Sequence, residues 1–420
     1  MMRSCSLILP FIFVTSAAAW AAETKEPRII DFKSAPHSYL EVEPRDRFAQ
    51  FQARARKGDV KIDTSDDKAF LSSLLAALNI PVSSQIMVFS ASSLQSEIIN
   101  PRNPRSLYFN EDTYVGWVPG GLIEIIAADP GHGPMFYVYD RLRPGGPVPD
   151  AQRSVKCMNC HAGNATRRLP GLIAESLLVS RAGSSLETYR RDVQGHQIPL
   201  EDRFGGWHLT GDHHIANHKA NVMGASQAGR IQKTPVEPGQ FSDLSLHLLP
   251  TSDILPHLIH EHQIGFENRL VYAIYTLRQL KSDNKGMLGA AASAEIEERA
   301  QEMARYIVFA DEAKFPAQGI NGDPAYATDF LRDRKATKAG LSLKDFDMKT
   351  RIFKHRCSFM LYTDTWKETP RELKDRIYYH MAMYLRDQPD AQHAHLPPAE
   401  RRAIRDILKE TMNDLPSWWR

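Results

Sequence analysis

The pentapeptide Cys157-Met158-Asn159-Cys160-His161 lies between a proline-rich stretch, residues 143–149, and Pro170-Gly171. Two thiols separated by two residues can each form a thioether with one vinyl group of the same porphyrin, and the adjacent imidazole can reach its iron. Cys-x-x-Cys also occurs in zinc sites and thioredoxin-like redox pairs. Because the chain has no second Cys-x-x-Cys and begins like an exported protein, we expect one haem c, attached through Cys157 and Cys160, with His161 as its proximal iron ligand.

The position of the pentapeptide in the chain predicts which kind of structure holds the haem. A compact cytochrome c has its motif directly after a long amphipathic helix. Here only residues 150–156 separate the proline-rich stretch from Cys157, which is too short for such a helix, and Pro170-Gly171 stops any helix soon afterwards. We therefore expect the haem to be held on a loop against a larger scaffold.

Residues 85–142 are predicted to form an antiparallel sheet. Short runs rich in Ile, Val, Phe and Tyr alternate with turn sequences at a spacing of about ten residues, which favours hairpins over parallel crossover units. The expected strands cover residues 85–90, 106–109, 114–118, 122–127 and 135–139, with two further strands at 172–180 and 204–211. Residues 224–243 are polar and turn-rich, and they are expected to form a surface excursion or a domain joint.

Helical periodicity dominates from residue 244 onward. Expected helices cover residues 255–280, 295–309, 345–366, 370–386 and 397–412, and residues 313–342 are expected to form an extended loop. Two earlier helices are expected, at 46–56 and at 66–79, the second capped by Ser65. The predicted fold class is α+β, with an antiparallel sheet-rich N-terminal half that carries the loop-held haem and a mainly α-helical C-terminal half.

The first residues have the features of a cleaved secretory signal. Arg3 precedes a short apolar run, and small residues precede a cut after Ala21. We expect a signal peptide at residues 1–21, a lead-in segment at 22–67, a sheet-rich haem domain at 68–243 and a helical domain packed on it at 244–420. The expected location is the periplasm, and no later stretch is apolar enough for an integral membrane segment.

The composition limits the possible partners and crosslinks. The chain has 52 Lys and Arg against 50 Asp and Glu, a balance that argues against a nucleic-acid partner. Of its four cysteines, Cys5 leaves with the signal and Cys357 is expected to be a buried, inert thiol. No disulfide framework is expected, so stability must come from a hydrophobic core.

The iron face opposite His161 has several candidate ligands. A methionine there raises the potential and suits electron transfer, a histidine gives a lower potential, and an open position suits binding of a small molecule. His213 is the first candidate because it lies in a loop beside glycines, where packing explains a histidine less well. Met360 and Met223 follow, although Met360 lies in an apolar run typical of a core.

Basic residues surround the pentapeptide and are candidate partners for the haem propionates. These are Arg153, Arg167 and Arg168, with Lys156 beside them. Two groups of histidines, 213/214/218 and 257/260/262, have spacings that allow two zinc ligands each, but neither offers a third. We expect the second group to be a polar face of an apolar helix.

Several strings beyond the pentapeptide resemble a family of large exported single-haem c-type cytochromes, labelled only as cytochrome c domain proteins. They are residues 106–118, 205–213 with His218, 261–263, 349–353, 357–360 and 415–419. The resemblance spans roughly residues 85–420. It implies covalent haem binding and export, and it implies nothing about a substrate.

These observations predict a periplasmic cytochrome that passes single electrons between a redox partner protein or a small donor and an acceptor. The alternative is a haem c oxidoreductase, peroxidase-like or oxidising small anions, with an open or weakly ligated iron; a third reading is a haem sensor or binding module. The scaffold is larger than a carrier needs, whereas most dihaem peroxidases need a second haem motif that this chain lacks. The sequence leaves open whether the protein is an enzyme.

Overall fold

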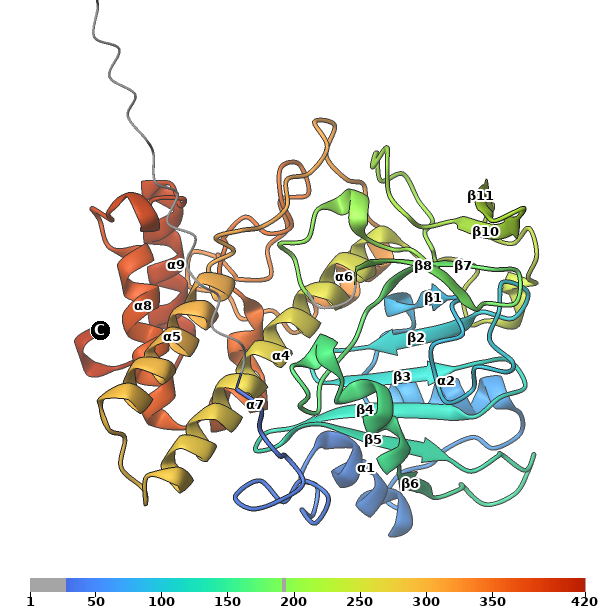
Figure 1. Cartoon of the computed structure of the whole chain (residues 1–420), viewed down its shortest axis with the longest axis horizontal. Helices are drawn as coiled ribbons and strands as arrows, with labels where there is room; N and C mark the ends of the chain where they lie inside the picture. Colours follow the sequence, from blue (N-terminus) through green and yellow to red (C-terminus); the bar gives the residue numbers. More distant parts are fainter. Residues whose placement is uncertain (1–27, 191–193, 420) are drawn as a thin grey trace, which may run out of the picture.

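The computed structural model describes residues 28–190 and 194–419. The predicted signal peptide at residues 1–21 lies outside this part of the chain. An antiparallel sheet forms most of the N-terminal half, and helices form most of the C-terminal half (Figure 1). The predicted α+β class is confirmed.

Seven strands form the main sheet in the spatial order β6–β5–β4–β3–β2–β1–β9, with all neighbours antiparallel (Figure 1). Strands β2 to β6 follow one another along the chain as neighbours, so the predicted hairpins are confirmed. The bounds are β1 (Ile86–Val88), β2 (Arg105–Phe109), β3 (Thr113–Trp117), β4 (Ile123–Asp129), β5 (Gly133–Tyr139), β6 (Ala151–Arg153) and β9 (Trp207–His208).

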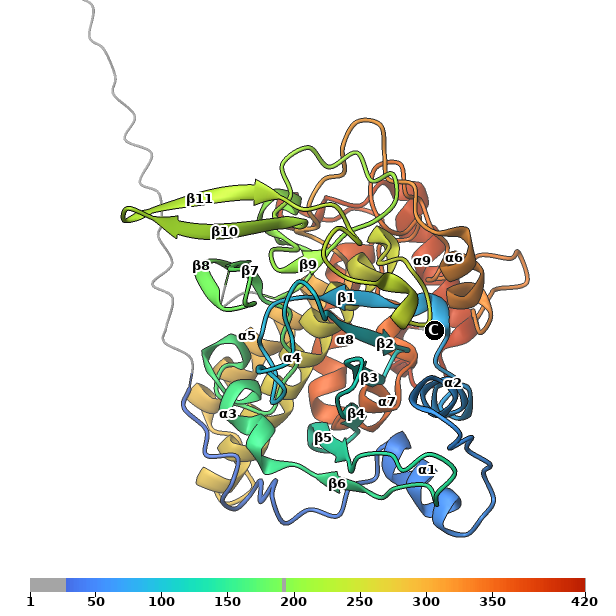
Figure 2. The same cartoon turned by 90° about the vertical axis from the view of Figure 1, so that its right-hand side faces the viewer.

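Successive side chains of these strands point to opposite faces of the sheet, and the two faces pack against different helices. On one face, Tyr108, Val115 and Tyr137 pack in a cluster with residues of α1 (Arg47–Arg56) and α2 (Asp67–Ala77). On the other face, Phe109 and Tyr114 belong to the larger cluster that includes residues of α4 (Ile254–Asp283). Figure 2 shows α1 and α2 on one side of the sheet and α4 on the other. The sheet is therefore buried on both faces.

A second sheet has the order β11–β10–β7–β8. Its strands are β7 (Ser176–Val179), β8 (Ser185–Arg190), β10 (Val222–Gln227) and β11 (Arg230–Pro235). The prediction for residues 224–243 missed the β10–β11 hairpin, which projects from the body (Figure 2). Because β11 is exposed along its whole length, its sequence has no alternation of apolar and polar residues.

The helical half is built around α4. The other helices are α5 (Ala290–Ile307), α6 (Pro324–Leu331), α7 (Asp364–Glu368), α8 (Arg371–Leu385) and α9 (Pro398–Thr411). The largest hydrophobic cluster joins Ile86 and Phe109 to Leu258, Met303 and Trp366. The sheet and the helices thus share one core across the predicted boundary at residue 244.

Three local predictions were wrong. Residues 345–366 form no long helix; that stretch contains turns, a bridge between Phe346 and Phe353, and only short helical segments near its end. The expected loop at 313–342 contains α6, which begins with a proline and is capped by Asp323. The cap of α2 is Asp66 instead of Ser65, because the Asp66 carboxylate accepts from the Ala69 N–H.

Among residues 28–190 and 194–419, no helix combines the length and the apolar character that crossing a membrane requires.

A buried acid, Glu267, lies on the face of α4 that meets the sheet. Its side chain is 2 % exposed, and its Oε1 has no hydrogen-bond partner among the described residues. Burial, and then the charge of Asp112, raise the pKa of Glu267 to about 8, while a hydrogen bond with Thr365 acts in the opposite direction. Glu267 is therefore protonated in the folded protein at neutral pH.

Replacing Glu267 by Gln tests this assignment. Between the carboxyl's ordinary pKa of 4.5 and its folded value of about 8, the folded state binds more protons, so rising pH must lower the stability of the wild type. We expect the free energy of unfolding of Glu267→Gln to fall less with rising pH than that of the wild type, with a difference on the order of a few kcal/mol by about pH 9. The measurement is urea unfolding at a series of pH values. The exposed Glu97→Gln serves as control; parallel curves for wild type and Glu267→Gln would contradict the assignment.

Candidate functional site

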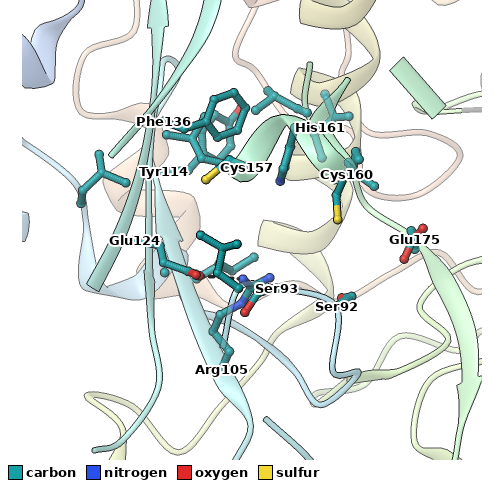
Figure 3. A pocket seen from close by; sticks show the side chains of 18 of the residues that line it. Ser92, Ser93, Arg105, Tyr114, Glu124, Phe136, Cys157, Cys160, His161 and Glu175 are labelled. Atoms are coloured by element: carbon teal, nitrogen blue, oxygen red, sulfur yellow. Dashed lines mark hydrogen bonds and ion pairs between the residues drawn. The ribbon is translucent and has the colours of Figure 1, made fainter. Parts of the chain in front are cut away.

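A cavity of about 300 Å³ lies between the pentapeptide, one face of the main sheet and α4 (Figure 3). The pentapeptide contributes Cys157, Asn159, Cys160 and His161 to its lining. The remaining walls come from strands β2 to β5, the loop after β1, residues 172–175, β9 and α4. Elements distant in the sequence therefore meet at the pentapeptide.

The edge of the sheet sets the position of the pentapeptide. Strand β6 pairs with β5, and the N–H of Ser154 donates to the Phe136 carbonyl over 2.9 Å. The chain then forms a short 3-10 turn (Val155–Cys157) and the one-turn helix α3 (Met158–His161). The pentapeptide is thus held on a short helical segment directly after an edge strand.

A hydrogen bond from one ring nitrogen to a backbone carbonyl holds the imidazole of His161 in place. Nδ1 lies 2.8 Å from the Gly171 carbonyl oxygen, which can only accept, so Nδ1 carries the hydrogen and Nε2 has the free lone pair. The ring also packs on Phe136, with 4.6 Å between ring centroids. Burial lowers the pKa of His161 to about 4, so the ring is neutral at neutral pH and Nε2 can bind a metal.

Gly171 is itself held in place by α4. The side-chain amide of Asn268 accepts from the Leu172 N–H and donates to the Leu172 carbonyl, each over 2.8 Å. A Cβ at Gly171 would lie 2.7 Å from Thr166 and 2.8 Å from Asn268 Oδ1, so only glycine fits there. The orientation of the His161 ring therefore depends on α4 as well as on the pentapeptide.

The two cysteines of the pentapeptide are not joined by a disulfide. Figure 3 shows the sulfur atoms of Cys157 and Cys160 and a ring nitrogen of His161 pointing from one side into the same cavity. Cys157 is partly buried, and burial raises the pKa of its thiol, whereas Cys160 is exposed. The side of the cavity at Cys160 therefore reaches the protein surface.

Across the cavity lies an ion pair between two strands that flank β3 (Figure 3). Arg105 of β2 contacts Glu124 of β4, with 3.0 Å between Nη1 and Oε2, and each side chain is only 15 % exposed. The pair passes over Gly116 of β3, where a Cβ would lie 3.6 Å from the Arg105 side chain and 3.7 Å from that of Glu124. The Nε of Arg105 is buried without a hydrogen-bond partner among the described residues.

The rest of the lining is mainly apolar and aromatic. Six residues illustrate this: Tyr114, Ile126, Phe136, Leu172, Trp207 and Ile264. His260 of α4 also lines the cavity, between the rings of Phe109, Tyr114 and Trp207. Burial, then the charges of neighbouring groups including Arg105, lower its pKa to about 3, so His260 is neutral.

The three residues predicted to bind the distal iron face lie elsewhere. His213 packs on His218, with 4.7 Å between ring centroids, in the loop after β9. Met360 is in the main core, and Met223 lies on β10 in a small cluster around Phe89. None of the three is among the described residues that line the cavity.

The three arginines predicted to bind propionates also have other partners. Arg153 donates to the Tyr39 and Val42 carbonyls and stacks on the Tyr39 ring. Arg167 pairs with Glu302, with 2.5 Å between Nη2 and Oε1. Arg168 contacts Asn164 over 3.4 Å. The cationic side chains that line the cavity are Arg105 and Lys156.

The sequence predicted that the second histidine group forms a polar face of an apolar helix, and this prediction was wrong. His257, His260 and His262 are all buried because α4 is covered on every side along this stretch. His257 hydrogen-bonds to Ser252, and His262 to Ser358. In residues 28–190 and 194–419, no cluster of at least three His, Cys, Asp or Glu side chains is suited to a metal ion.

The cavity has the chemical groups that a covalently attached haem needs. Two thiols can form thioethers, Nε2 of His161 can bind the iron, and apolar walls can pack on the porphyrin. Arg105 and Lys156 supply positive charge for carboxylates. The residues present therefore fit a haem.

Comparisons with known proteins give no relative: no protein-family model matches the chain, and neither a curated protein nor a solved structure has significant similarity to it.

The sequence did not identify the wall opposite the pentapeptide. Arg105, Glu124 and His260 lie far from residues 157–161 in the chain, and they meet at the cavity only through strand register and the packing of α4. Gly116, in the middle of an otherwise bulky strand, is the one local signal, because a strand glycine indicates close approach of other groups.

Replacing Asn268 by Ala tests the support of the pentapeptide. The change removes two hydrogen bonds and leaves the Leu172 N–H and carbonyl without these partners, so we expect a loss of about 1–3 kcal/mol in the free energy of unfolding, measured in urea. As control we choose Thr328→Ala, which removes one exposed side-chain hydrogen bond on α6. Equal effects of the two substitutions would contradict the role of Asn268.

Proposed function

We propose that the protein is a c-type cytochrome that binds one haem covalently through Cys157 and Cys160, with His161 as axial ligand, and that it transfers single electrons. We also propose that it is exported, since its first residues have the features of a cleaved signal. Its partner would be a redox protein or a small electron donor or acceptor.

One observation carries the proposal. Both thiols and the imidazole of the pentapeptide face the same cavity, and the bond from Nδ1 to the Gly171 carbonyl leaves Nε2 available for a metal (Figure 3). In a zinc site or a redox dithiol, the thiols would need each other or further ligands. Here a large, mostly apolar cavity lies beside them, as a porphyrin requires.

A haem bound there supplies an iron that accepts and releases one electron at a time. The chain's own residues would orient and shield it. Phe136 and Gly171 hold the His161 ring, and the sheet and α4 form walls of the cavity. Cys160 and Asn159 are exposed, so the attached edge would lie within reach of a partner at the surface.

A haem oxidoreductase with an open iron position is the second candidate. The observation that favours it is the wall opposite the pentapeptide, where Arg105 and Glu124 form a polar pair and where His260 is the only histidine or methionine among the described residues that line this wall. A carrier with two protein ligands would need a ligand from that wall.

The attachment can be tested by changing each thiol. The protein would be produced in a host that attaches c-type haem, and its pigment measured as the pyridine haemochrome after acidic acetone extraction. We expect the wild type to keep its haem and each of Cys157→Ala and Cys160→Ala to show the spectrum of a haem with one free vinyl group. The double variant should lose all covalent haem.

Cys357→Ala is the matched control, because Cys357 is buried in the core and is not among the residues that line the cavity. It should keep the wild-type spectrum. A colourless wild-type protein, or a pigment that acidic acetone removes completely, would show that the proposal is wrong.

A further inference from the structure

We propose that Arg105 and His260 form a binding site for a small exogenous anion in the haem cavity, on the wall opposite His161. The inference rests on the proposed haem binding and adds a ligand class to the same site. The anion would be small, with one negative charge and oxygen or nitrogen acceptor atoms.

The first argument is the state of the Arg105 guanidinium. Glu124 uses Nη1 of Arg105, while Nε is buried without a hydrogen-bond partner among the described residues. Nη2 has no hydrogen bond to a described residue, and the Arg105 side chain lines the cavity, so Nη2 can donate to an acceptor that enters the cavity. Figure 3 shows Arg105 on the side of the cavity toward which the His161 ring nitrogen points.

The second argument is the imidazole of His260, which is only 4 % exposed. The side chains of its neighbours His257 and His262 hydrogen-bond to serine hydroxyls, whereas the imidazole of His260 has no hydrogen bond to a described residue. The rings of Phe109, Tyr114 and Trp207 surround it and leave it facing the cavity. A neutral imidazole there can donate one N–H to a ligand.

The two groups favour an anion over a neutral ligand. Arg105 has a fixed positive charge, and its side chain lines the same cavity as His161 and His260. A charge-assisted hydrogen bond from a guanidinium in a mostly apolar cavity is stronger than one between neutral groups. Since Glu124 already neutralises part of that charge, the site suits one negative charge and a small ligand.

A competing arrangement has the same chemistry. Arg105 could instead donate to a carboxylate of the haem itself, which is also an anionic acceptor. The direction of the His161 ring favours the exogenous anion, because Arg105 lies across from the ring nitrogen that would bind the iron (Figure 3). The two arrangements predict different effects of changing Arg105.

The test is a titration of the oxidised, haem-loaded protein with azide, followed by the Soret band. We expect azide to bind the wild type and Arg105→Leu to weaken binding roughly 10- to 100-fold, the loss expected for one charge-assisted hydrogen bond. Glu124→Gln should strengthen binding, because it removes the carboxylate that competes for the guanidinium. A purely structural role of the pair would weaken binding in both variants.

Two further variants keep the test conclusive. The double variant Arg105→Leu with Glu124→Leu removes the pair without leaving a buried unpaired carboxylate, and it should bind azide as weakly as Arg105→Leu alone. Arg141→Leu changes an exposed arginine whose side chain donates, among the described residues, only to the Gly120 carbonyl, and this variant should bind azide like the wild type.

Each contrary result has a separate meaning. Protein without haem overturns the proposed function, and the anion site with it. A haem-loaded wild type whose spectrum does not respond to azide overturns the anion site alone. If Arg105→Leu leaves the azide affinity unchanged but shifts the reduction potential, Arg105 binds a haem carboxylate and the exogenous site is likewise wrong.

Discussion

The hydrogen bond between His161 Nδ1 and the Gly171 carbonyl is the interaction on which the site depends. It fixes which ring nitrogen faces the cavity. It also links the pentapeptide to α4, because Asn268 binds the next residue, Leu172, through both its N–H and its carbonyl. The local motif and the long central helix therefore act together, and neither alone would orient the imidazole.

The sheet supplies the other half of the site through strand alternation. The face that packs on α1 and α2 is aromatic and aliphatic, whereas the face toward the cavity carries the Arg105 and Glu124 pair across Gly116. A side chain at Gly116 would enter the space beneath this pair. Burial on both faces explains why β3 and β5 are almost continuously apolar.

The features that the sequence predicted well are those encoded locally. The hairpin turns between β2 and β5 and the long apolar helix at α4 both appear within short windows. The features it missed depend on distant contacts or lack a pattern. The β10–β11 hairpin has no apolar face, and α6 is short and begins at a proline.

The residues of the site divide in the same way, into neighbours in the chain and residues that meet through distant contacts. Cys157, Cys160 and His161 are neighbours in the chain and line one cavity. His213, Met223 and Met360, which the sequence predicted as distal ligands from residue type and local context, lie outside the lining, whereas Arg105 and His260 reach it through register and helix packing. The most direct measurement of the central claim is iron anomalous scattering from crystals of the haem-loaded protein. The account predicts one iron peak beside His161 Nε2, between the pentapeptide and Arg105; a peak at another site, or none, would contradict it.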